Sequence, residues 1–311
     1  MRQRTPHRVT AKKGTFMAHY AITCCSTVDL SREHLKEKNI EFIPFHYYLD
    51  EAAYDDDLFT SLSPSEFYKA LTEGAEPKTA QVNVDEFLAH FTPILESGKD
   101  LIHLSLSSGL SGVFNSANVA ANMLAEKFPE RKIYVVDTLG ASSGYGLIAD
   151  KAAELRDAGM DIDSLRDWLE AHKKEMHHWF FSTDLTFFIK GGRVSPLSGW
   201  FGTVLKICPL LDMDKEGHLV PRFKIRGKQR VRQEIVNKMK EFAHDRENYS
   251  GKCFLSHSDC YEDARAVADL VEEAFPNLYG KVVINNIGPT IGCHTGPGTV
   301  ALFFWGDERN A

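Results

Sequence analysis

The pattern that decides the fold lies in residues 101–136, LIHLSLSSGLSGVFNSANVAANMLAEKFPERKIYVV. The apolar runs Leu101–Leu106 and Lys132–Val136 are typical of buried strands. Between them, apolar residues recur at helical spacing over Val113–Phe128, and Pro129 ends this helix. A strand, a helix and a strand joined by short links predict a parallel sheet with right-handed crossovers.

The alternation of strands and helices continues on both sides of this segment. On the N-terminal side, strands are expected at His19–Thr23 and Ile40–Tyr48. On the C-terminal side, one helix follows Gly146 and runs toward Arg156, and another spans Asp163–Glu175. The chain therefore begins with an α/β unit that contains a parallel sheet.

The character of the sequence changes at His177, where we place a domain boundary. A turn rich in Gly, Ser and Pro and a predicted hairpin, Leu210–Met213 with His218–Phe223, follow it. A second α/β unit is completed by helices and strands expected at Gln229–His244, Cys253–Ser256, Tyr261–Phe275 and Lys281–Asn285. The sequence thus predicts an α/β protein with a mobile extension over residues 1–16 and two α/β domains over residues 17–177 and 178–311.

Composition excludes several classes of protein. The 311 residues are 43% hydrophobic and 25% charged, as in ordinary globular proteins, which argues against a disordered scaffold. The net charge of −7 argues against sequence-independent binding to nucleic acid, although Lys224–Arg232 is a local basic run. With no apolar stretch of about 20 residues and no signal segment, we expect a cytoplasmic protein with at most transient membrane association.

Cysteine and histidine spacing gives little support for a metal site. The six cysteines are scattered without a CxxC pair, so reduced thiols are expected. His177 and His178, with His172 on the preceding helix, could suggest a metal, but no carboxylate or cysteine accompanies them at ligand spacing. We therefore expect solvated surface histidines and no metal.

Three loops share one design, in which a strand ends in a run of Gly, Ser or Thr and a helix or turn follows. They are Ser105–Gly112, Asp137–Gly146 and Gly288–Gly298. Any one of them could be a tight turn that caps a helix. Together, at strand ends where open α/β sheets form their ligand crevice, they favour an anion site, because glycine permits close approach and helix starts offer unpaired N–H groups.

Missing motifs narrow the choice of anion. Neither GxxxxGK[ST] nor a GxGxxG after the first strand occurs, which disfavours nucleotides. The GLSG sequence is not the GxSxG elbow of α/β-hydrolases. A carboxylate needs only a few hydroxyl or imidazole groups, which Thr79, Ser111 and His294 could supply.

Five motifs, in order, resemble the DegV family, and the resemblance covers about Met17 to Gly306. They are KTAQVNVDEF (Lys78–Phe87), HLSLSSGLSGVFNSA (His103–Ala117), VVDTLGASSGYG (Val135–Gly146), FIKGGRVS (Phe188–Ser195) and IGCHTGPGTV (Ile291–Val300). The resemblance implies two α/β domains that hold one long-chain fatty acid, of about C14 to C18. Its carboxylate would lie at the domain interface, on the N-terminal side, and its acyl chain in a tunnel of the C-terminal domain.

The resemblance also implies a function. Characterised DegV relatives are the substrate-binding subunits of bacterial fatty acid kinase, in which a separate ATP-binding subunit phosphorylates the bound fatty acid. We therefore expect a non-catalytic binding subunit with no cofactor and with a kinase subunit as partner. A lipid carrier or sensor with no kinase role is the alternative, followed by a stand-alone small-molecule kinase or hydrolase.

Motif positions assign expected roles to single residues. Thr79, Ser111 and His294 resemble the family's head-group ligands, and the nearby head-group region would include Ser26, Ser107, Ser108 and Gly112. Arg193 and Arg226 match arginines of the exposed surface near the pocket mouth, where they would dock the kinase subunit. The tunnel wall is expected to include Phe187, Ile189, Leu205 and Ile207.

Two departures from the family pattern affect the head-group network. Cys25 stands where the family usually has aspartate at the end of the first strand, so any hydrogen bond of that aspartate is lost. Ala80 replaces a serine beside Thr79, which removes a hydroxyl. Neither change alters the expected fold.

Overall fold

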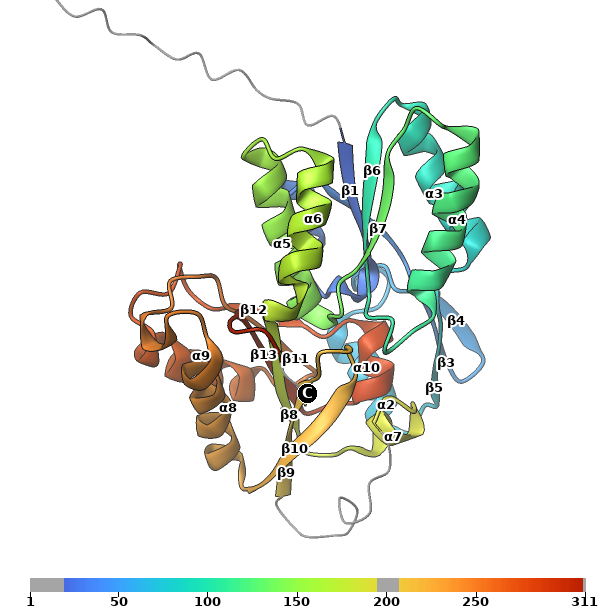
Figure 1. The fold of residues 1–311 in the computed structure, drawn as a ribbon. Coiled ribbons are helices and arrows are strands. Elements are labelled where there is room, and N and C mark those ends of the chain that lie inside the picture. Colours follow the sequence, from blue (N-terminus) through green and yellow to red (C-terminus); the bar gives the residue numbers. More distant parts are fainter. Residues whose placement is uncertain (1–19, 195–206, 310–311) are drawn as a thin grey trace, which may run out of the picture.

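The computed structural model describes residues 20–194 and 207–309. In its N-terminal half, four parallel strands form a sheet in the order β2-β1-β6-β7 (Figure 1). The strands are β1 (Tyr20–Cys25), β2 (Ile40–Ile43), β6 (Asp100–Ser105) and β7 (Ile133–Asp137). The prediction of an α/β fold with an N-terminal parallel sheet is confirmed.

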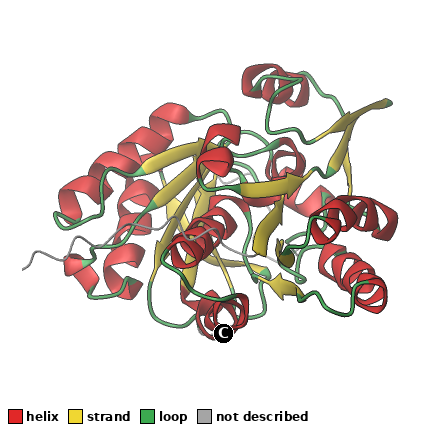
Figure 2. Cartoon of the chain, turned by 90° about the horizontal axis from the view of Figure 1, so that it is seen from above, coloured by secondary structure: helices red, strands yellow, loops and turns green. Residues whose placement is uncertain are grey.

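Helices cover both faces of this sheet, as Figures 1 and 2 show. One face packs against α3 (Val84–Glu96) and α4 (Val113–Lys127). The other face packs against α1 (Arg32–Glu37), α5 (Ser142–Asp157) and α6 (Ile162–His172). Every residue of β1 is buried, because both of its faces are covered in this way.

A small antiparallel sheet, in the order β4-β3-β5, lies beside the main one. It consists of β3 (His46–Leu49), β4 (Ala52–Asp55) and β5 (Pro77–Ala80), and it packs with α2 (Pro64–Thr72). The single strand expected over residues 40–48 is therefore wrong. Pro44, which has no N–H to donate, separates β2, which pairs with β1, from β3, which pairs with β4 and β5.

The C-terminal half is built on a mixed six-stranded sheet in the order β10-β9-β8-β13-β11-β12. Its helices α8 (Lys228–Phe242) and α9 (Tyr261–Ala274) pack against one face. The predicted hairpin is confirmed as β9 and β10. The strands are β8 (Met176–Ser182), β9 (Ile207–Met213), β10 (Leu219–Arg226), β11 (Phe254–His257), β12 (Val283–Asn286) and β13 (Thr299–Trp305).

The opposite face of this sheet looks toward the N-terminal half. Helix α5 and the short helices α7 (Thr186–Lys190) and α10 (Pro289–Thr295) lie on that side (Figure 1). Short 3-10 turns complete the described elements at Ser26–Val28, Lys173–Glu175 and Arg246–Asn248. The expected boundary after residue 177 falls inside β8, so the division into domains stays a prediction, and the extension 1–16 lies outside the described residues.

Helix α5 begins earlier than expected, at Ser142 instead of after Gly146. Two of its glycines allow other parts of the chain to pack closely against the helix. A Cβ on Gly144 would lie 2.4 Å from His178 Nε2, and one on Gly146 would lie 2.7 Å from the Val28 carbonyl oxygen. The Gly and Ser run that reads as a loop is thus the first turn of a tightly packed helix.

The expectation of solvated histidines at 177 and 178 is wrong, because both lie in the buried central strand β8. The His177 ring stacks on Phe304 and on Phe242. Burial lowers the pKa of His177 to about 4 and that of His178 well below its usual value. Both are therefore neutral groups of the protein interior at neutral pH.

The described residues contain neither a membrane-spanning helix nor a cluster of metal ligands. Over residues 20–194 and 207–309, no helix is both long enough and apolar enough to cross a bilayer. Within the same part of the chain, no three His, Cys, Asp or Glu side chains are grouped so that they could hold a metal ion.

Candidate functional site

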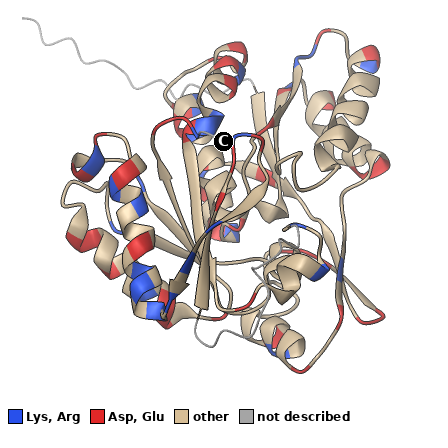
Figure 3. Cartoon of the chain, turned by 60° about the horizontal axis from the view of Figure 1, so that its bottom comes forward, with Lys and Arg blue, Asp and Glu red and all other residues tan. Residues whose placement is uncertain are grey.

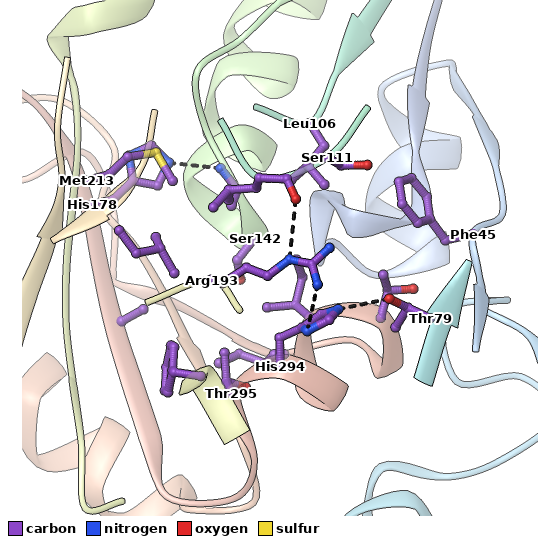
Figure 4. A pocket seen from close by; sticks show the side chains of 18 of the residues that line it. Phe45, Thr79, Leu106, Ser111, Ser142, His178, Arg193, Met213, His294 and Thr295 are labelled. Carbon is purple, nitrogen blue, oxygen red and sulfur yellow. Dashed lines mark hydrogen bonds between the residues drawn. The ribbon is translucent and has the colours of Figure 1, made fainter. Parts of the chain in front are cut away.

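A cavity of about 600 Å³ lies between the two halves of the molecule (Figure 4). Its wall is formed by the strand ends of the N-terminal sheet, by α10 and by the face of the C-terminal sheet that α8 and α9 do not cover. Most of its lining is apolar, including Phe45, Leu106, Leu110, Phe180, Phe188, Met213, Leu219, Ile291, Ala301 and Phe303. The cavity thus suits a ligand that is mainly hydrocarbon.

The three Gly, Ser and Thr loops meet at this cavity. Ser105–Gly112 follows β6 and Asp137–Gly146 follows β7, and because these strands are parallel their carboxyl ends share one edge of the sheet. Gly288–Gly298 contains α10 and reaches the cavity from the C-terminal half. Each loop contributes residues to the lining.

Thr79, His294 and Arg193 form a hydrogen-bonded row at one side of the cavity (Figure 4). The Arg193 guanidinium only donates, so the His294 Nδ1 atom 3.3 Å away accepts from it. The proton of the neutral ring then sits on Nε2, which donates to Thr79 Oγ1 at 2.8 Å. The hydroxyl hydrogen of Thr79 is therefore available to a ligand.

His294 stays neutral in this row. Burial, together with the neighbouring Arg193 charge, lowers the pKa of His294 to about 4. The positive charge of the row therefore resides on Arg193, which is half-buried at the cavity wall. A cation beside two hydrogen-bond donors is an environment that favours a carboxylate.

Ser111 lies at the same side of the cavity, ahead of the first turn of α4. Its hydroxyl donates to Gln81 Oε1 at 3.0 Å and accepts from the Val113 N–H at 3.2 Å. Gly112, which also lines the cavity, permits this approach, since a Cβ there would lie 3.1 Å from Gln81 Oε1. The structure thus brings Thr79, Ser111 and His294 to one cavity.

Of the other serines in the expected head-group region, Ser26 and Ser107 are buried behind the wall, whereas Ser108 is exposed. Ser26 Oγ accepts from the Phe45 N–H at 3.0 Å, and Ser107 Oγ donates to the Gly217 carbonyl at 2.9 Å. The Ser108 N–H donates to Asp137 at 3.2 Å. These serines fix the loops and strand ends around the cavity, and none of them is among its described lining residues.

Three of the four expected tunnel residues are described, and none of these three is among the described lining residues. Phe187 packs near the small sheet, Ile189 packs against the core around α5, and Ile207 is half-buried at the start of β9. Leu205 lies outside the described residues. Residues 186–190 form helix α7, so the ring that reaches the cavity is that of Phe188.

The two arginines expected on the surface have different positions. Arg193 lies in the cavity wall, where it also donates to the Gly191 carbonyl at 2.7 Å and to the Leu110 carbonyl at 3.3 Å. Arg226 is exposed at the end of β10 and is not among the described lining residues. Figure 3 shows that Lys and Arg positions alternate with Asp and Glu positions along many of the helices and loops.

Two buried carboxylates support the wall, and sequence reasoning missed them. Asp29 accepts from the Ser142 hydroxyl and from the Gly288 N–H, and Asp56 accepts from the Thr290 hydroxyl at 2.6 Å. Burial raises the pKa of both aspartates. No motif marks this pairing, because the partners are more than a hundred residues apart in the sequence.

The two departures from the family pattern occupy distinct places. Cys25 is fully buried beside His103, with its Sγ atom 3.6 Å from His103 Nε2, and it does not line the cavity. Ala80 does line the cavity, next to Thr79. The missing hydroxyl at position 80 therefore changes the cavity wall directly, whereas Cys25 changes the packing behind it.

A family model and a related sequence both match this chain, and both belong to the same family. A family model described as "Uncharacterised protein, DegV family" matches residues 19–307. A DegV domain-containing protein of Clostridium perfringens is 33% identical over 294 residues, which are 94% of this chain and 99% of that protein.

Solved structures share the fold. A structure described as fatty acid binding of a DegV family protein from Thermus thermophilus has a TM-score of 0.82 and 26% identity, covering 92% of this chain and 99% of that one. The fatty acid kinase B3 protein of Streptococcus pneumoniae, solved with linoleic acid, has a TM-score of 0.79 over 93% and 99% of the two chains. At 21% identity, this second likeness concerns the fold alone.

Proposed function

The chain belongs to the DegV family, and from this premise we propose that it binds one long-chain fatty acid and presents the carboxylate to a partner kinase subunit. The observation that carries the proposal is an apolar cavity of about 600 Å³ with a cluster of hydrogen-bond donors at one side. An apolar chain and a single anionic head group match that division of the lining.

The head group in this proposal is bound by Thr79, Ser111 and His294. Thr79 donates its hydroxyl hydrogen to the carboxylate, and His294 fixes the orientation of Thr79. Ser111 turns its hydroxyl hydrogen from Gln81 Oε1 to the carboxylate when the ligand binds. Arg193 supplies positive charge and keeps the Nε2 proton on His294. A carboxylate taken from water requires such donors, because an unpaired buried anion costs several kcal/mol.

The acyl chain supplies most of the affinity. Burying about 14 methylenes at about 0.8 kcal/mol each gives roughly 11 kcal/mol before the cost of ordering the chain. Phe180, Phe188 and Phe303 offer large apolar surfaces for this purpose. The fatty acid in the description of the T. thermophilus relative supports the same ligand class for this chain.

The kinase role in this proposal follows from membership of the DegV family and from analogy with the S. pneumoniae fatty acid kinase protein, which shares the fold. In this role the chain contributes no catalytic group of its own, and the partner brings ATP to the carboxylate. Arg226, which is exposed outside the cavity, is suited to contact acidic groups on such a partner. A lipid carrier or sensor without a kinase is the second candidate, which the apolar cavity favours equally.

Turnover of ATP in the presence of fatty acid distinguishes these candidates. We expect acyl phosphate only when the chain, a fatty acid and an ATP-binding kinase subunit of a DegV system are all present. Acyl phosphate formed by the chain alone would make it an enzyme. If the chain binds fatty acid but no DegV-system kinase subunit forms acyl phosphate with it, the carrier or sensor role remains.

A further inference from the structure

Thr299, the first residue of β13, has a hydroxyl group with no hydrogen-bond partner among the described residues. The residue is only 1% exposed, so bulk water does not solvate this hydroxyl. Its backbone is fully engaged, since the Thr299 N–H donates to Ser258 Oγ at 2.8 Å and its carbonyl accepts from the Ser258 N–H at 3.0 Å. Only the side-chain hydroxyl is left over.

The register of β13 directs this side chain toward the cavity. Alternate residues of a strand share a face, so Thr299, Ala301 and Phe303 point the same way, and all three line the cavity. Val300 and Leu302 point to the opposite face, where they pack against α8 and α9. The neighbouring strand β8 repeats this arrangement, with His178 and Phe180 in the lining.

The other hydroxyl groups of the described lining all have partners within the protein. Thr79 is paired with His294, and Ser111 is paired with Gln81. The remaining ones, on Ser142, Thr290 and Thr295, donate to Asp29, Asp56 and the Gly296 carbonyl. Thr299 is therefore the exception, and its position on the sheet face separates it from the donor row at Thr79, His294 and Arg193.

A valine would fill the same volume at position 299 without a polar atom that lacks a partner, so a wall made only for hydrocarbon gains nothing from threonine. A ligand group that exchanges a hydrogen bond with the threonine does gain from it. We propose that the cavity takes a fatty acid whose acyl chain carries one hydroxyl group, which pairs with Thr299 Oγ1. This inference rests on the proposed fatty acid binding and specifies the ligand class of the same cavity.

The test is a binding panel on protein freed of co-purified lipid. The ligands are hexadecanoic acid, monohydroxy hexadecanoic acids substituted near the carboxylate, in mid-chain or at the methyl end, and a cis-monounsaturated acid of the same length. The quantity compared is the ratio of each affinity to that of hexadecanoic acid. In the wild type, one hydroxylated isomer should have a ratio about tenfold higher than in Thr299→Val, the effect of one buried hydrogen bond.

Thr299→Ser is the matched control, because it keeps the hydroxyl and removes the methyl group that valine retains. It should preserve the preference for the hydroxylated isomer, whereas Thr299→Val should bind hexadecanoic acid at least as well as the wild type does. The inference would be overturned if wild type and Thr299→Val had equal affinity ratios for every hydroxylated acid. It would also be overturned if the affinity ratio changed only for the unsaturated acid. In both cases the proposed fatty acid binding would still stand. Failure of every fatty acid to bind would overturn the proposed function as well.

Discussion

Thr79 can offer its hydroxyl hydrogen to a ligand because His294 Nε2 donates to its oxygen, and His294 does so because Arg193 occupies the Nδ1 side of the ring. Two residues of the C-terminal half thus set the chemistry of one residue of the N-terminal half. Sequence motifs identified Thr79, Ser111 and His294 as candidates. They could not show that Arg193 faces the cavity, because this depends on contacts 83 and 101 residues apart in the sequence.

At this scale we first predict that Thr79→Val, Ser111→Ala and His294→Ala each weaken fatty acid binding by about 1 to 3 kcal/mol, the usual effect of leaving a buried polar group without its partner. Affinity would be measured by titration, with melting temperatures to verify folding. Thr92→Val is the control, because the Thr92 hydroxyl bonds only within α3, to the Leu88 carbonyl. Wild-type affinity in all three site variants would refute the assignment of the carboxylate site.

The two arginines should separate binding from transfer. Arg226→Ala, outside the cavity, should leave fatty acid affinity near normal and reduce partner-dependent acyl phosphate formation roughly tenfold, or about 1.4 kcal/mol. Arg193→Ala should reduce affinity as well, because it removes the donor beside His294 Nδ1. Unchanged transfer in Arg226→Ala would leave the docking surface unassigned, and unchanged affinity in Arg193→Ala would contradict its place in the donor row.

At the scale of single elements, the turn after α7 positions His294 through two glycines with different roles. A Cβ on Gly191 would lie 2.3 Å from His294 Nδ1, although the backbone there is ordinary (φ −74). Gly192 has a φ of +69, and a Cβ there would meet nothing within 4 Å. Gly191 therefore provides space, whereas Gly192 provides a left-handed conformation.

This difference predicts opposite results for two similar substitutions. Gly191→Ala should displace His294 and weaken fatty acid binding about tenfold or more, with a small loss of stability. Gly192→Ala should cost about 1 kcal/mol of stability, from backbone strain, and leave affinity nearly unchanged. Titration and thermal unfolding of both variants would check this, and equal affinities would show that His294 does not need the space at Gly191.

The same scale shows where sequence patterns are sufficient. Helix α4 and its flanking strands were predictable, because apolar spacing, Pro129 and short links all agree. The secondary structure of residues 179–189 was not predictable. A mostly apolar stretch has no clear periodicity that would show where strand β8 ends and helix α7 begins. Phe187 and Ile189, which were expected in the tunnel wall, lie in α7 and are not among the described lining residues.

At the scale of the whole molecule, buried neutral histidines link stability to pH. Burial lowers the pKa of His103 to about 3 and those of His90, His177 and His294 to about 4, from 6.5. Between pH 6.5 and 4 the unfolded chain therefore binds more protons than the folded one, so the free energy of unfolding falls as the pH falls. Each group contributes a slope of at most about 1.4 kcal/mol per pH unit.

His90 provides the test of this linkage, since its Nε2 atom is buried without a hydrogen-bond partner among the described residues. His90→Leu should not lower stability at pH 7 and should reduce the loss of stability between pH 6.5 and 4.5. Denaturant unfolding across that range would measure the slope. The same slope in variant and wild type would show that His90 is not a neutral buried group.

The two halves of the molecule supply different parts of the cavity. Strand β5 of the small sheet supplies Thr79, and the loop after β6 supplies Ser111. Helix α10 supplies His294, and the face of the C-terminal sheet supplies apolar wall. The sequence indicated both α/β units and all three loops. It could not indicate the buried contacts of Asp29 with the Gly288 N–H and of Asp56 with Thr290, which hold the cavity wall in place across the two halves.

The central claim, that this cavity holds one long-chain fatty acid, is tested most directly by extracting lipid from the purified protein. Protein produced in a bacterial host would be denatured, extracted and analysed by gas chromatography and mass spectrometry, with the lipid compared to the amount of protein. The account predicts about one equivalent of fatty acid in the C14 to C18 range, because burial of the acyl chain makes release slow. Protein that contains no fatty acid and that also fails to bind added palmitate or oleate would contradict it.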